Sequence, residues 1–135
     1  MWHTISYVST ANRHLNDPDI NQLFEFVKTN NNDLNITGIL MYSDGNFFQI
    51  LEGKKELISN LFKKILNDSR HYNLIKIFDH EMLEPTFSGY KSNFTTIYKR
   101  SERSELQQFL EKERSNNPDT FNSVSYLTNK FMQVP

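Results

Sequence analysis

The chain has 135 residues, and its 15 Lys and Arg against 16 Asp and Glu give a formal net charge of −1 at pH 7. This length suits one domain whose hydrophobic core needs no metal or disulfide to support it. Because the chain has no cysteine, disulfides, thiolate metal sites and cysteine nucleophiles are excluded. The near-neutral charge argues against binding nucleic acid through a basic surface, which requires clustered Lys and Arg.

Nothing in the sequence points to a membrane. The mean hydropathy is −0.63, and the apolar runs fall well short of the roughly 18 residues that a transmembrane helix needs. Residues 1–10 read as the start of a strand and lack the basic and then apolar layout of a signal peptide. We therefore expect a cytoplasmic protein.

The first predicted elements are a strand and a helix. Residues 2–9 mix β-branched and aromatic residues with short polar ones, which predicts a strand. Asn16-Asp17-Pro18-Asp19 is typical of a helix start, because it offers a capping side chain, a first-turn proline and acidic residues near the positive helix end. The polar run at residues 30–33 predicts the end of this helix. Its apolar face is predicted to consist of Ile20, Leu23, Phe24 and Val27.

A hairpin is the strongest local signal. Asp44-Gly45 separates two apolar strands, at residues 36–42 and 46–52, and this dipeptide is typical of a tight turn. Residues 54–68 carry a wide apolar stripe at helical spacing, which predicts the second helix. Further along the chain we predict strands at residues 74–83 and 92–98, then helices at residues 104–114 and 120–132.

The order β-α-β-β-α-β-β with two trailing helices predicts an α+β, ferredoxin-like sheet. Two helices are expected on one face of this sheet and the two C-terminal helices on the other. The first and third strands should be neighbours. With no repeat or linker, residues 1–99 form the main unit and residues 100–135 form a helical extension packed on the sheet.

Polar side chains sit among the apolar ones of two strands. Strand alternation places Gln49 on one face between Phe47 and Leu51, and it places Tyr7 on the same face as Ile5. A buried amide and a buried hydroxyl both need partners, so Tyr7 and Gln49 could bond to each other if their strands are adjacent. On these residues alone, the simpler interpretation is a structural pair in the core.

Two other polar clusters have alternative interpretations. The Asn30-Asn31-Asn32 run is typical of a helix terminus, but an amide at the edge of the gap between helix and sheet could also bind a flat heterocycle. Lys64, Asp68, Arg70 and His71 follow the end of the second helix. They form either a solvated helix end or a site for a polar tail or a phosphate.

Other chemistries lack support. Gly53-Lys54 is no phosphate loop, since no Gly lies five residues before Gly53 and no Ser or Thr follows the lysine. No nucleophile motif is present. We predict no metal site, because metal-ligand spacing is absent from the four histidines, His3, His14, His71 and His80.

Five segments, in order and with matching spacing, resemble a BLUF domain, the blue-light sensor that uses flavin. The resemblance runs from about residue 2 to residue 98, and the two trailing helices resemble those of the short, stand-alone members. The segments are Tyr7-Val8-Ser9, Asn30-Asn31, Ile36-Thr37-Gly38-Ile39-Leu40, Asp44-Gly45-x-Phe47-x-Gln49-x-Leu51-Glu52-Gly53 and Asp68-x-Arg70-His71.

The resemblance implies roles for individual residues. Tyr7 matches the family's electron and proton donor to excited flavin, and Gln49 matches the glutamine that bridges this tyrosine to flavin N5 and O4. Asn31 matches the asparagine that holds the O4/N3 edge. The other implied contacts are Asn30 beside Asn31, Phe47, Ile36 and Ile65 along the ring, Lys64 near O2, and Asp68, Arg70 and His71 at the tail.

The implied function is a photocycle on a non-covalently bound flavin, FAD in the first place, with FMN and riboflavin as other candidates. A Tyr–Gln–flavin hydrogen-bond switch would signal to a separate downstream protein. We expect the protein to be a photosensory module and not an enzyme. We also expect it to form a homo-oligomer. Two alternatives stay open. One is a small flavin-dependent redox enzyme, and the other is a light-insensitive domain that binds a partner.

The chain departs from the family in one segment. After Phe87 the family usually has Trp-x-Met, where this chain has Tyr90-Lys91-Ser92. That segment is thought to relay the change at the glutamine to the neighbouring strand and the trailing helices. The resemblance therefore implies that Tyr90 and Ser92 occupy the relay positions.

Overall fold

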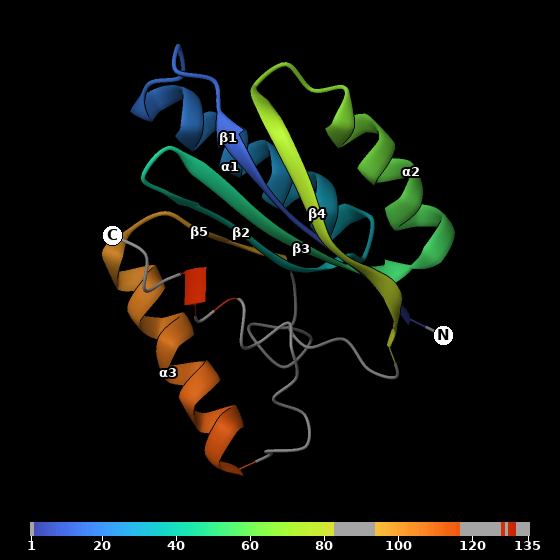
Figure 1. Ribbon diagram of the computed structural model, residues 1–135. Helices are drawn as coiled ribbons and strands as arrows, with labels where there is room; N and C mark the ends of the chain where they lie inside the picture. Colours follow the sequence, from blue (N-terminus) through green and yellow to red (C-terminus); the bar gives the residue numbers. More distant parts are fainter. Residues whose placement is uncertain (1, 83–93, 117–127, 129, 132–135) are drawn as a thin grey trace.

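The computed structural model describes residues 2–82, 94–116, 128 and 130–131, which form one sheet with helices on both faces (Figure 1). Its strands are β1 (Trp2–Ala11), β2 (Thr37–Ser43), β3 (Asn46–Lys54), β4 (His71–Met82) and β5 (Phe94–Ile97). Its helices are α1 (Asp17–Asp33), α2 (Lys55–Leu66) and α3 (Arg100–Asn116).

The strands lie in the order β4-β1-β3-β2-β5. β3 pairs antiparallel with both β1 and β2, while β5 adds to β2 in parallel. The predicted adjacency of the first and third strands is therefore confirmed, and the arrangement is ferredoxin-like. β4 is an edge strand that begins at His71, three residues earlier than predicted, because its first residues already pair with the end of β1.

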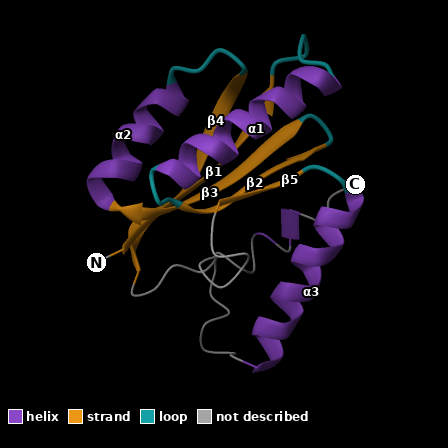
Figure 2. Ribbon diagram, turned by 180° about the vertical axis from the view of Figure 1, so that it is seen from behind, coloured by secondary structure: helices purple, strands orange, loops and turns teal. Residues whose placement is uncertain are grey.

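Helices α1 and α2 cover one face of the sheet, and α3 lies on the other face (Figure 2). The two helices on one face are as predicted. Of the two predicted C-terminal helices, α3 corresponds to the first and is longer than expected, whereas the second falls mostly outside the described residues. The relay positions Tyr90 and Ser92 also lie outside the described residues.

Local sequence signals explain the ends of α1. The Asn16 side chain accepts from the Asp19 N–H at 2.9 Å, and the Asp19 carboxylate accepts from the Asn16 N–H at 3.0 Å, which is a capping box. At the other end, residues 30–33 form the last turn of the helix rather than interrupting it. The Asn32 side chain bonds to the backbone of Phe94, so it does not compete for the hydrogen bonds of its own helix.

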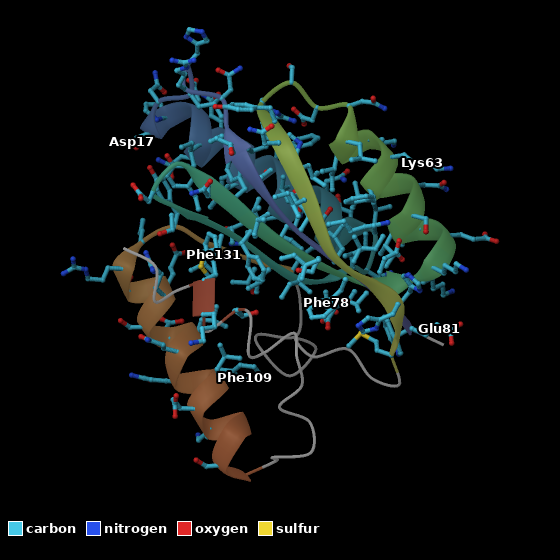
Figure 3. The ribbon with its side chains drawn as sticks, in the orientation of Figure 1. Asp17, Lys63, Phe78, Glu81, Phe109 and Phe131 are labelled. Carbon is cyan, nitrogen blue, oxygen red and sulfur yellow. The ribbon has the colours of Figure 1, made fainter. Side chains whose placement is uncertain are left out.

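The core has two parts, one on each face of the sheet. Between the sheet and α1 and α2, buried residues include Ile5, Phe24, Leu51 and Ile58. The second part lies between the sheet and α3 and is built around Phe48, Ile50, Leu106 and Leu110. Three partly buried aromatic residues pack against this second part, and Figure 3 labels them: Phe78, Phe109 and Phe131.

Candidate functional site

A cavity of about 270 Å³ lies between the sheet and helices α1 and α2, and residues of all three line it. This volume is close to the lower end of the ~300–1,000 Å³ that small-molecule sites span. The residues singled out from the sequence line it with one exception. They are Tyr7, Asn30, Asn31, Phe47, Gln49, Lys64, Ile65, Asp68, Arg70 and His71.

The exception is Ile36. Its side chain is 1% exposed and belongs to the apolar core, and it is not one of the cavity residues. Its role along a bound ring stays a prediction. Ile36 precedes β2 directly, where the strand packs beneath the helices.

Five apolar residues line the cavity without having been assigned to the site from the sequence: Leu23, Phe26, Val27, Leu40 and Leu61. A helical pattern connects most of them to the predicted residues. Positions 23, 26, 27, 30 and 31 follow the i, i+3, i+4 spacing of a single helix face. Leu40 pairs directly with Gln49 across the β2–β3 ladder and so faces the same side of the sheet.

Tyr7 and Gln49 form a buried hydrogen bond inside this cavity. They oppose each other in the β1–β3 register, and the Tyr7 hydroxyl donates to Gln49 Oε1 at 2.5 Å. Both side chains are almost fully buried. Burial, with a smaller contribution from the Asp68 carboxylate, raises the pKa of Tyr7 above its usual value. The phenol therefore stays protonated and acts as a donor at neutral pH.

Asn31 brings an unpartnered donor to the cavity. The residue is 2% exposed, and its backbone carbonyl accepts from the Ile36 N–H at 2.9 Å. Its side-chain Nδ2 has no hydrogen-bond partner within the described residues. A buried donor without a partner costs about 1–3 kcal/mol. A ligand with a carbonyl oxygen at this edge would remove that cost.

His71 is fixed through both ring nitrogens. Nε2 donates to the Ile65 carbonyl at 2.7 Å, since a carbonyl can only accept. Nδ1 lies 2.7 Å from the Ser9 hydroxyl, which donates to it in the neutral ring. The ring centroid lies 6.0 Å from that of Tyr7 and 6.4 Å from that of Phe47. His71 thus connects β1 to the end of α2 and offers the cavity a fixed ring.

Charged groups lie at the α2 end of the cavity. The Arg70 guanidinium donates to both carboxylate oxygens of Asp68, with Nη2 2.6 Å from Oδ2 and Nε 3.0 Å from Oδ1. The hydrogen bonds from Arg70 hold the pKa of Asp68 below its usual range. Lys64 lines the same cavity from α2. This end combines a fixed ion pair with a further cation.

The arrangement has a definite chemical character. The walls from α1 and α2 are apolar, the sheet side presents the Tyr7–Gln49 pair, and Asn31 adds a donor that needs an acceptor. A planar heterocycle with ring carbonyls and a polar tail matches this pattern, and flavin is such a molecule. Within the described residues, no group of three or more His, Cys, Asp or Glu side chains could hold a metal ion.

Fold and site together define a ferredoxin-like domain with a cavity for a planar ligand between its two helices and its sheet. Residues 2–93 match the family described as BLUF, sensors of blue-light using FAD. This chain belongs to the BLUF family, whose domains are photosensory modules that bind flavin. In the described part of the chain, no helix combines the length and the apolar character that crossing a membrane requires.

Curated relatives match only through part of their length. The photoactivated adenylate cyclase subunit beta of Euglena longa is 36% identical over 74 residues, which are 55% of this chain and 9% of that protein. The blue light- and temperature-regulated antirepressor BluF of Escherichia coli (strain K12) is 31% identical over 68 residues, which are 47% of this chain and 17% of that protein. The chain thus spans less than a fifth of either relative.

Solved structures match over more of the chain. The photo-activated state of BlsA has a TM-score of 0.65 at 26% sequence identity, covering 100% of this chain and 97% of that one. The BLUF domain of BlrP1 has a TM-score of 0.70 at 26% identity, covering 93% of this chain and 88% of that one. These likenesses agree with the fold described above.

Proposed function

We propose that this chain is a blue-light photoreceptor that binds a flavin non-covalently in the cavity and signals to a separate protein. The observation that carries the proposal is the buried Tyr7–Gln49 hydrogen bond at the edge of the cavity, in a chain of the BLUF family. We take FAD as the natural ligand, with FMN and riboflavin as ligands that share the same ring.

Different lining residues would contact different parts of a bound flavin. The buried Nδ2 of Asn31 would donate a hydrogen bond to a ring carbonyl, and the Gln49 amide lines the same cavity. Phe47 and Ile65 would cover the apolar ring. Lys64 would approach flavin O2, and the Asp68–Arg70 ion pair and His71 would contact the polar tail.

Flavin supplies the absorption of blue light and, once excited, an electron acceptor. Tyr7 is suited to donate an electron and a proton, because its hydroxyl is already hydrogen-bonded to Gln49 Oε1. An amide carries a donor and an acceptor on one group, so a change of orientation or tautomer at Gln49 would alter its bonding on both sides. In a buried, low-dielectric network, such a change is strongly coupled to its neighbours.

We infer sensing rather than substrate turnover. Tyr7 and Gln49 occupy the polar edge of the cavity where a redox substrate would need access, and both are nearly fully buried. The output would therefore pass to a downstream protein. Two relatives carry names that link light to an output, namely a photoactivated cyclase and a light-regulated antirepressor. The residues of this chain that would relay the change include Tyr90 and Ser92.

The test is an absorption spectrum of the purified protein in the dark, directly after blue light, and during dark recovery. We expect a bound-flavin spectrum that shifts to the red without bleaching and relaxes thermally. Tyr7→Phe and Gln49→Leu should keep the flavin and lose the shift. Tyr42→Phe serves as the matched control, because this tyrosine packs on Phe47 but does not line the cavity.

Two results would contradict the proposal. A bound flavin without any shift would favour the redox enzyme, which bleaching by NAD(P)H with turnover of an acceptor would then support. A protein purified without flavin from flavin-replete cells would favour a light-insensitive domain that binds a partner.

A further inference from the structure

Asn32 ties the last turn of α1 to strand β5. Its Oδ1 accepts from the Phe94 N–H at 2.8 Å, and its Nδ2 donates to the Phe94 carbonyl at 3.3 Å. One amide thus pairs with the backbone of Phe94 much as a neighbouring strand would. β5 has only four residues and lies at the edge of the sheet, with β2 as its strand neighbour. Asn32 therefore adds a second backbone attachment to β5 besides its ladder with β2.

Asn31, the residue before Asn32, faces the cavity. Asn31 lines the cavity with its unpartnered Nδ2, whereas Asn32 reaches Phe94. Successive residues of an α-helix point about 100° apart, so one turn presents the first amide to the cavity and the second to β5. A shift or rotation of this turn moves both side chains together. The two asparagines connect the cavity to β5 through a single rigid turn.

β5 leads directly into α3. The N–H groups of Tyr98 and Lys99 both donate to Glu102 Oε1, at 3.1 Å and 2.7 Å, which joins the end of β5 to the first turn of α3. The Tyr98 hydroxyl donates to Asp17 Oδ1 at 2.5 Å, at the start of α1, where Figure 3 labels Asp17. α1 therefore holds the β5 segment by hydrogen bonds at these two points, and the Phe24 ring also packs on Tyr98. Of the two hydrogen-bonded residues of this segment of the described chain, only Phe94 is held by a residue next to a cavity residue, since Asn32 follows Asn31.

We propose that Asn32 is the positioning residue through which a change in the cavity reaches β5 and α3. The light-dependent part of this proposal rests on the proposed function. A ligand that engages Asn31 holds the last turn of α1, Asn32 holds Phe94 from the same turn, and β5 passes the constraint to α3. This connection consists entirely of described residues and includes neither Tyr90 nor Ser92.

The test is hydrogen–deuterium exchange of the full chain, followed at the amides of Phe94–Ile97 in the apo, flavin-bound dark and illuminated states. In the wild-type chain, flavin should slow exchange at these amides, and light should change it again. In Asn32→Ala, the Phe94 amide should exchange about fivefold faster, as expected for the loss of a hydrogen bond worth ~1 kcal/mol. Its exchange should no longer respond to flavin or to light. Flavin affinity and the spectral red shift should remain.

Tyr98→Phe is the matched control, because it removes the hydrogen bond between Tyr98 and Asp17. Neither of these two residues lines the cavity. It should loosen β5 while leaving the response to flavin and light intact. Asn32→Asp keeps the acceptor for the Phe94 N–H and loses the donor, so it should retain part of the response.

Several results overturn the inference. Asn32→Ala could speed exchange equally in every state and leave the flavin-dependent difference unchanged, which would make Asn32 merely structural. Loss of the response in Tyr98→Phe as well would show general loosening of β5. A wild-type chain with no flavin-dependent change at Phe94–Ile97 also overturns it. A wild-type chain that responds to flavin but not to light contradicts the photoreceptor proposal, and the comparison of apo and flavin-bound exchange then decides the role of Asn32.

Discussion

Gly38 of β2 lies with its Cα directly against the carbonyl of Ile50, the residue that follows Gln49 on β3. A Cβ at residue 38 would overlap the Ile50 oxygen, and the backbone there has a φ of +131°, which L side chains rarely adopt. The close approach of β2 to β3 therefore depends on glycine at this position.

Gly38→Ala should lower the free energy of unfolding by about 2–4 kcal/mol, since backbone strain and overpacking add at one site. Chemical denaturation measures this loss. Gly45→Ala is the control, because Gly45 also has a positive φ, +80°, but no described atom lies within 4 Å of its added Cβ. Its cost should be limited to about 1–2 kcal/mol of backbone strain. Equal losses in the two variants would refute the close-approach argument.

Asn31→Ala should weaken flavin binding by about tenfold or more, because it removes the donor that a ring carbonyl would satisfy. The apo protein should be at least as stable as the wild type, since the variant also removes a buried unpartnered donor. Asn31→Asp should bind flavin more weakly still, because a carboxylate only accepts. Flavin titration of the apo proteins, with denaturation curves of the same samples, measures both effects. Unchanged affinity in both variants would exclude Asn31 from the ligand contacts.

His71→Phe should destabilise the protein by about 1–3 kcal/mol. The ring shape is roughly kept, but the Ile65 carbonyl and the Ser9 hydroxyl lose their partner. The control is His80→Ala, since His80 is exposed, its Nδ1 bonds to the carbonyl of the next residue, and its ring packs edge-on against Phe78. That variant should stay within about 0.5 kcal/mol of the wild type. Thermal and denaturant unfolding of the two variants test the difference.

The Asp68–Arg70 pair should add to stability above the usual carboxyl pKa and lose its contribution in acid. The hydrogen bonds from Arg70 lower the pKa of folded Asp68 below the unfolded value of about 3.9. The unfolded chain therefore takes up a proton first, and stability falls as the pH drops through the folded-state pKa. Both side chains are partly exposed, so the effect at pH 7 should be about 0.2–1 kcal/mol.

Asp68→Asn should flatten the pH dependence of the unfolding free energy below about pH 4, where the wild-type carboxyl takes up its proton. Arg70→Gln should raise the pKa of Asp68 towards its usual value, which carboxyl titration by NMR measures. A wild-type slope retained in Asp68→Asn would mean that other carboxylates govern acid unfolding.

Much of the fold was predictable because its signals are local. The capping box at Asn16 and Asp19 depends on residues three apart, and the Asp44-Gly45 turn depends on a dipeptide that adopts positive φ at both positions. The side-chain period of a strand then placed Gln49 and Tyr7 on faces that meet once β1 pairs with β3. The alternation made their hydrogen bond possible on the condition that the two strands are adjacent, and the β1–β3 register places the two residues opposite each other.

The division of neighbouring residues between core, cavity and β5 needed the tertiary structure. Asn31 and Asn32 have the same intrinsic preferences, yet one lines the cavity and the other holds Phe94. Ile36 was expected at the cavity but is buried in the core, while Phe26 lines the cavity although 61% exposed. Periodicity tells which side of an element a residue occupies. Only packing decides what lies opposite that side, because this depends on contacts between segments far apart in the chain.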